Sequence, residues 1–176
     1  MSGGAVVSDG YNVLVAGCLT VSFQRYPESQ IKGPAPTPRS HGALPVEMSS
    51  SRSGFLPLRE AEGLWLGVQP IEQKCCSVEI RWIGAKEGVI PPPWTALVSN
   101  FQCISGLRSA TGVLFPFIGF PLSDEFTPCG GIVICVNEPE GIEMRFVSVD
   151  EYETRSGKSA PRPILPTDSY AGWLLP

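Results

Sequence analysis

Proline and glycine recur along the whole chain and limit how long any regular element can be. The sequence holds 19 glycines and 18 prolines in 176 residues, about a fifth of the chain against a usual share of about an eighth. Proline removes a backbone donor and glycine weakens the interior of a helix, so both residues favour turns. Their distribution predicts many short elements joined by turns and few long helices.

Most apolar segments between these turns have the two-residue period of a strand. Two pairs of segments predict hairpins: 64–69 with 75–84, joined by a short turn, and 131–137 with 142–149, joined by EPEG at 138–141. We expect strands in the segments 11–25, 64–69, 75–84, 111–122, 131–137 and 142–149.

One segment departs from the strand pattern. In PPPWTALVSNFQCISGL (91–107), apolar residues recur at helical spacing, with a proline suited to the first turn and a glycine placed to end the helix. The pattern predicts an amphipathic helix over about 93–105, and its apolar stripe comprises Trp94, Leu97, Val98, Phe101 and Ile104. Further along, Ser148 and Glu151 match a capping box and predict a short helical turn.

These elements together predict an α+β, sheet-dominated fold. We expect a twisted antiparallel sheet of roughly six strands with the helix at about 93–105 packed on it. A chain of 176 residues suits one core, so we expect a single domain over 1–176. Within it, a Pro/Ser/Gly-rich arm or loop covers about 27–54, and a coil-like C-terminal tail covers about 154–176.

Two stretches of the chain resemble each other. VEIRWIG (78–84) and IEMRFVS (142–148) both alternate apolar side chains with a glutamate and an arginine. On a strand, the apolar residues would face the core and the charged residues would face water. The likeness has three explanations: ordinary half-buried strands, two strands that pair with each other through Glu–Arg contacts, or a duplicated hairpin.

Charge and hydropathy exclude several partners. The net charge is −4 and basic residues are not clustered, which argues against nucleic-acid binding. No segment approaches the roughly 20 apolar residues of a membrane span, and the apolar run at 13–21 lacks a basic region before it. We therefore expect a cytoplasmic protein. Charged residues are 17% of the chain, below a norm of roughly 25%, which favours a homo-oligomer.

The chain lacks the common motifs of catalysis and cofactor binding. Neither a nucleophile elbow nor a phosphate-binding or dinucleotide-binding glycine loop is present, so we expect no cofactor. The single histidine, His41, lies in a predicted loop, and the cysteine spacings do not suit zinc. We expect no metal and mostly buried, reduced thiols at Cys18, Cys75, Cys76, Cys103, Cys129 and Cys135.

A few residues remain as candidates for catalysis. Cys129 is followed by two glycines, whose backbone N–H groups would suit an oxyanion site. The carboxylates of Glu60 and Glu62, or of Asp124 and Glu125, would suit general acid and base roles. A turn that opens a strand explains the glycines equally well, and solvated loops explain the acids. A small hydrolase or isomerase is therefore one alternative function.

The density of aromatic residues predicts an apolar pocket between helix and sheet, with the arm at 27–54 as its lid. The simpler explanation is that these rings form the core. Our first hypothesis is a non-enzymatic small-molecule binding or accessory protein that takes a small apolar ligand through Trp65, Trp82, Trp94, Phe115, Phe117, Glu60 and Glu62. A further alternative is a protein-interaction adaptor or immunity-type protein, and the candidates for an interface in the tail are Tyr170, Trp173, Leu174 and Leu175.

Overall fold

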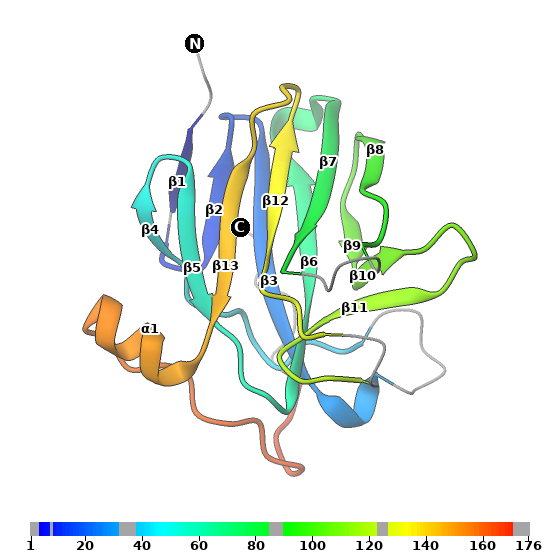
Figure 1. The fold of residues 1–176 in the computed structure, drawn as a ribbon. Coiled ribbons are helices and arrows are strands. Elements are labelled where there is room, and N and C mark those ends of the chain that lie inside the picture. Colours follow the sequence, from blue (N-terminus) through cyan, green and yellow to red (C-terminus); the bar gives the residue numbers. More distant parts are fainter. Residues whose placement is uncertain (1–3, 8, 32–37, 85–89, 123–126, 171–176) are drawn as a thin grey trace.

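The protein folds into two β-sheets that face each other, as the computed structural model shows for residues 4–7, 9–31, 38–84, 90–122 and 127–170 (Figure 1). Strands make up 47% of the structure and helix 9%, which confirms a sheet-dominated fold. The expected single sheet of about six strands is wrong, because the strands divide into sheets of seven and six. The inner faces of both sheets are apolar, and stacking them buries both at once.

The first sheet has seven antiparallel strands. The order is β1 (Ala5–Val7), β2 (Asn12–Val15), β3 (Leu19–Pro27), β6 (Glu62–Pro70), β11 (Leu114–Ile118) and β10 (Gly106–Arg108), with β9 (Gln102–Ile104) on β6. Strands β9 and β11 follow each other along the same edge of β6, whose other edge pairs with β3.

The second sheet has six strands, which are antiparallel except that β5 and β13 run parallel. Its order is β4 (Glu47–Ser50), β5 (Ser53–Pro57), β13 (Ile142–Val147), β12 (Gly131–Val136), β7 (Cys76–Ile83) and β8 (Trp94–Val98).

Of the two expected hairpins, the structure contains one. Strands β12 and β13 pair across the turn at 138–141, as predicted. Strands β6 and β7 do not pair, because a 3-10 turn, η2 (Ile71–Gln73), carries the chain from the first sheet to the second. β7 alternates buried and exposed residues, whereas β6 is buried at almost every position, and neither pattern reveals whether neighbours in sequence share a sheet.

The predicted helix at 93–105 is wrong, since the segment forms β8, a bend at Ser99 and Asn100, and β9. Trp94, Ala96 and Val98 face the core, whereas Leu97, which the helical stripe would have buried, is 73% exposed. Two sheet edges, offered by β7 and β6, supply backbone partners for this segment. Tertiary pairing thus overrides the local helical spacing.

The short helix after β13 is confirmed. α1 (Val149–Ser156) is capped by Ser148, whose hydroxyl accepts a hydrogen bond from the Glu151 backbone N–H at 3.2 Å. It ends at Gly157, which adopts a left-handed conformation with φ of 69°. The single fully buried side chain of α1, Tyr152, packs edge-on against Phe55 of β5.

Much of the expected arm at 27–54 belongs to the fold. It contains β4 and the start of β5, and the side chains of Leu44 and Val46 are buried in the core. Backbone hydrogen bonds from His41 to Arg25 and from Leu44 to Phe23 bind the segment to β3, beyond the end of β2. Residues 32–37 lie outside the described ranges.

The two similar stretches form β7 and β13, which lie on opposite sides of β12. Val133 of β12 is in register with Arg81 on one side and with Glu143 on the other. The proposed pairing between the two stretches is therefore wrong. Each arginine instead contacts the glutamate of its own strand: Arg81 with Glu79 at 3.0 Å, and Arg145 with Glu143.

Candidate functional site

One hollow lies at an open edge of the sandwich, where β8 ends the second sheet and β9 and β10 end the first. We call it the edge groove. Its volume is about 530 Å³, within the range of roughly 300–1,000 Å³ that suits small molecules. It is lined by Pro92, Pro93, Trp94, Thr95, Cys103, Ile104, Ser105, Gly106, Arg108 and Leu114.

The local backbone explains why the sandwich is open here. At the opposite edge, the Ala5 N–H donates to the Ser51 carbonyl at 2.7 Å and ties the two sheets together. No backbone hydrogen bond joins β8 to β9 or β10 within the described ranges. Gly106 lets β10 approach β11 closely, since a Cβ there would lie 2.2 Å from the Phe115 carbonyl oxygen.

The groove combines an aromatic wall with a cation. Trp94 is half-buried and belongs to the inward-facing set of β8. Arg108 is exposed, and its Nη1 donates to the Gly112 carbonyl at 3.0 Å. No carboxylate of the described residues forms an ion pair with this guanidinium. Burial raises the pKa of the Cys103 thiol to about 11, so this part of the wall is neutral at physiological pH.

Of the seven residues predicted to line a pocket, the edge groove contains Trp94. Three others form an aromatic cluster between the sheets: Trp82 stacks on Phe117 with ring centroids 5.8 Å apart, and Phe115 meets Trp82 edge-on at 6.2 Å. Trp65 and Phe117 are 1% and 0% exposed. These three and Trp65 therefore act mainly as core, and none of them lines the edge groove.

The two predicted acids, Glu60 and Glu62, lie in different environments. Glu60 is exposed, whereas Glu62 is buried and lies 3.6 Å from Arg25. The Glu62 carboxylate also accepts a hydrogen bond from the Ile164 backbone N–H at 3.1 Å. Glu62 thus contacts both the Arg25 side chain and the Ile164 backbone, and Glu60 takes part in neither contact. The other predicted acids, Asp124 and Glu125, lie outside the described residues.

Cys129 lacks the surroundings of a nucleophile. The residue is 3% exposed, its thiol donates to the Gly131 carbonyl at 3.2 Å, and desolvation raises the pKa of the thiol well above the ordinary value. The Gly130 N–H, one donor of the hypothetical oxyanion site, already bonds to the Ile83 carbonyl at 3.0 Å. These contacts favour a structural role for the cysteine and its glycines.

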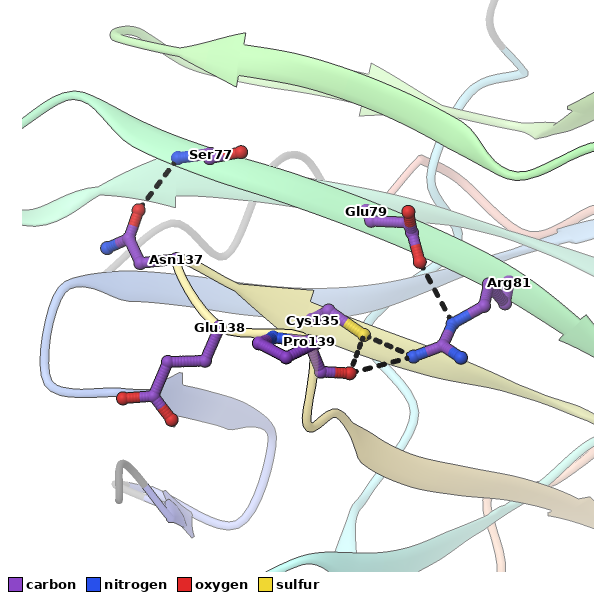
Figure 2. Close-up of a pocket in the computed structure, with 7 residues that line it drawn as sticks. All are labelled: Ser77, Glu79, Arg81, Cys135, Asn137, Glu138 and Pro139. Atoms are coloured by element: carbon purple, nitrogen blue, oxygen red, sulfur yellow. Dashed lines mark hydrogen bonds and ion pairs between the residues drawn. The ribbon is translucent and has the colours of Figure 1, made fainter. Parts of the chain in front are cut away.

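A second hollow, of about 310 Å³, lies on the outer face of the second sheet beside the β12–β13 turn (Figure 2). Arg81 dominates it: Nη2 donates to the Cys135 sulfur at 2.7 Å and to the Pro139 carbonyl at 3.1 Å. Its Nε lies 3.0 Å from Glu79. Figure 2 shows these contacts converging on one guanidinium. Because protein groups already surround the cation, this hollow has less to offer a ligand than the edge groove.

A third hollow, of about 380 Å³, lies at the base of the sandwich, between the segment after β3 and the C-terminal tail. His41 and Tyr170 meet there edge-on, with ring centroids 5.4 Å apart. Arg39 lies over the Tyr170 ring at 4.3 Å. Tyr170, one of the predicted interface residues, thus contacts its own chain although it is 52% exposed. The other three, Trp173, Leu174 and Leu175, lie outside the described residues.

The cysteines are all free thiols: Cys75 is exposed, Cys76, Cys129 and Cys135 are buried, and Cys18 and Cys103 are intermediate. The described residues contain no cluster of three or more side chains suited to a metal ion. They also contain no helix with the length and hydropathy needed to cross a membrane.

Comparison of the chain with protein-family models, curated proteins and solved structures finds no match. The function must therefore be argued from the residues of this chain alone. Sequence reasoning identified Trp94 but missed Arg108, because the expected helix ended just before that residue. One signal could have helped: Arg108 lies between Gly106 and Pro116, and both residues favour short strands and turns.

Proposed function

We propose that this protein is a non-enzymatic binding protein whose edge groove takes a small amphipathic anion. Such a ligand has a flat apolar body and one negatively charged group. The observation that carries the proposal is that Trp94 and Arg108 both line one groove of about 530 Å³. A ring face binds apolar surface, and a guanidinium recognises carboxylate, sulfonate or phosphate through paired hydrogen bonds.

Three features of the groove support binding without catalysis. The Cys103 thiol is protonated at neutral pH, as its raised pKa implies, and so is a weak nucleophile. No histidine, aspartate or glutamate is among the lining residues that the structure describes, so this part of the groove offers no usual general base. The walls are β-strands held in two sheets, which keeps the groove preformed and limits the entropy lost on binding.

The test is a titration with anilinonaphthalene sulfonate, an aromatic anion whose fluorescence rises in apolar sites. We expect saturable binding at one site per chain. Arg108→Gln should weaken it about 10- to 100-fold, the effect of losing a charged hydrogen bond of about 1.5–3 kcal/mol. The matched control is Arg145→Gln, which removes the same charge from an exposed position on β13 and should leave binding unchanged.

A second variant locates the probe. Trp94→Phe keeps an aromatic wall, so the probe should still bind, but energy transfer from tryptophan to the probe should fall. Equal affinity of the Arg108→Gln and unaltered proteins would contradict the proposal. Unsaturable binding that is insensitive to both substitutions would do the same, because it would indicate general adhesion to apolar surface.

A further inference from the structure

The C-terminal segment after α1 crosses the base of the sandwich and is held there by two partly buried arginines and a buried glutamate. We call residues 161–168 the strap; Figure 1 shows it in red-orange below the strands. Arg59 Nη2 donates to the Pro161 carbonyl at 2.8 Å, and Arg25 Nη1 donates to the Arg162 carbonyl at 2.8 Å. Glu62 accepts from the Ile164 N–H at 3.1 Å.

Arg25, Arg59 and Glu62 together form a binding site for the strap, which we call the receptor. Arg25 and Glu62 form an ion pair at 3.6 Å, and their side chains are 12% and 5% exposed. All three contacts with the strap are made to backbone atoms, in the manner of a site that binds an extended chain. The second Glu62 oxygen has no hydrogen-bond partner although it is buried. Removing the strap would take a hydrogen bond from each of these three side chains, and water or another chain would have to replace it.

The strap has a shape of its own. Arg162 and Asp168 form two hydrogen bonds of 2.8 Å, and the Leu165 N–H donates to the same carboxylate at 2.7 Å. Prolines at 161, 163 and 166 restrict the backbone further. The strap is therefore organised by internal contacts, and the receptor holds it through three backbone atoms. A short link at 157–160 joins it to α1, and its first three residues are exposed. Two contacts hold this link: Lys158 pairs with Glu47, and the Ala160 N–H donates to Glu153 at 2.9 Å.

We propose that the receptor of Arg25, Arg59 and Glu62 binds the strap of a second copy of this chain as well as its own. Two copies that exchange straps form a homodimer in which every strap contact of the monomer is kept. Exchange of an identical element requires no new complementary surface. The free energy difference between monomer and dimer therefore depends on the conformation of the link and on the protein concentration. The self-contained strap and the short glycine-led link are the features that favour this partner over an unrelated peptide.

The first experiment tests the receptor with a fluorescent synthetic peptide of residues 159–170 and full-length protein. Ile164→Pro in the protein removes the N–H that Glu62 accepts and so weakens the resident strap while leaving the receptor intact. We expect the peptide to bind this variant at least tenfold more tightly than the unaltered chain. Asp168→Asn, which loosens the internal turn of the strap, is a second variant of the same kind.

Adding Glu62→Gln to Ile164→Pro should abolish peptide binding, whereas adding Glu60→Gln, a matched change at an exposed acid two residues earlier, should not. A peptide that itself carries the Ile164→Pro change should fail to bind. Equal binding to the unaltered and strap-weakened chains, or binding that survives Glu62→Gln, would overturn the receptor. Circular dichroism confirms that each variant is folded.

The second experiment tests exchange of the strap. Each chain is incubated at high protein concentration and returned to ambient temperature, and light scattering then measures whether it is a monomer or a dimer. The unaltered and Glu60→Gln chains should contain dimer, and the Ile164→Pro and Glu62→Gln chains should be monomeric. Peptide binding without a dimer of the unaltered chain would overturn strap exchange. A dimer that persists in both the Ile164→Pro and the Glu62→Gln chains would overturn it as well, since another surface would then hold the copies together.

Discussion

Replacing Phe117 tests whether the aromatic cluster is core, as the structure indicates, or ligand-binding surface. Its ring is 0% exposed and lies 5.8 Å from the Trp82 ring and 6.4 Å from the Phe146 ring. Phe117→Ala should lower the free energy of unfolding by about 3–5 kcal/mol through lost transfer energy and a cavity. For a domain of this size, that is a fall in melting temperature of about 6–20 °C. Phe117→Leu, which keeps most of the volume, should cost less than about 2 kcal/mol.

The assay is guanidinium unfolding followed by far-ultraviolet circular dichroism, with Leu97→Ala as the control. Leu97 is 73% exposed on the outer face of β8, so its loss should change stability by no more than about 0.5 kcal/mol. The folded Phe117→Leu protein should bind anilinonaphthalene sulfonate as the unaltered protein does. A destabilisation below about 1 kcal/mol for Phe117→Ala would refute the assignment of this ring to the core.

Three further predictions concern thiols, the helix and pH. A thiol reagent at mildly alkaline pH should modify Cys75 first and Cys129 only after unfolding, because Cys129 is buried and its pKa is raised; early modification of Cys129 would contradict its structural role. Ser148→Ala should cost about 1 kcal/mol in a denaturant titration, since it removes the N-cap of α1; an unchanged midpoint would show that the cap is not needed. Arg162 lowers the pKa of Asp168 from 3.8 to about 2, so the stabilising contact is present above about pH 4 and lost as pH falls through 2. The difference in melting temperature between the unaltered and Asp168→Asn chains should shrink steadily as the pH falls from 4 to 2, and a difference that stays constant over that window would exclude the ion pair as its cause.

Local sequence patterns identify about half of the strands that the structure describes, but not their sheet membership. The turn at 138–141 is short and its flanking segments alternate, so the β12–β13 hairpin is predictable from local chemistry. The connection at 71–75 also looks like a turn, yet it crosses between sheets. Sheet membership depends on which long-range pairing buries the most apolar surface, and β6 pairs with β3 over nine residues. A local sequence pattern does not show which of these long-range pairings is the most favourable.

The predicted helix shows how a spacing can fit two structures. Trp94 and Val98 are four residues apart, which places them on one side of a helix and equally on one side of a strand. Leu97 decides between the two, and its exposure on β8 was not visible from the sequence. The error also hid the edge groove, whose walls are the strands that replace the helix.

Part of the candidate site was nevertheless predictable. Trp94 and Glu62 were singled out from the sequence, and both have specific positions in the structure: one in the edge groove and one beneath the strap. Arg108 was not, because a single arginine in a short strand has no distinctive pattern. Its importance arises from the absence of an acidic partner in the described structure, which only the tertiary arrangement reveals.

The central claim is that the edge groove binds a small amphipathic anion, and native mass spectrometry of the purified protein tests it most directly. The unaltered chain should carry a small additional mass that is lost on denaturation, and the Arg108→Gln chain should carry none. The same spectra report the number of chains in each particle. A bare chain in both proteins, or the same additional mass in both, would contradict the account.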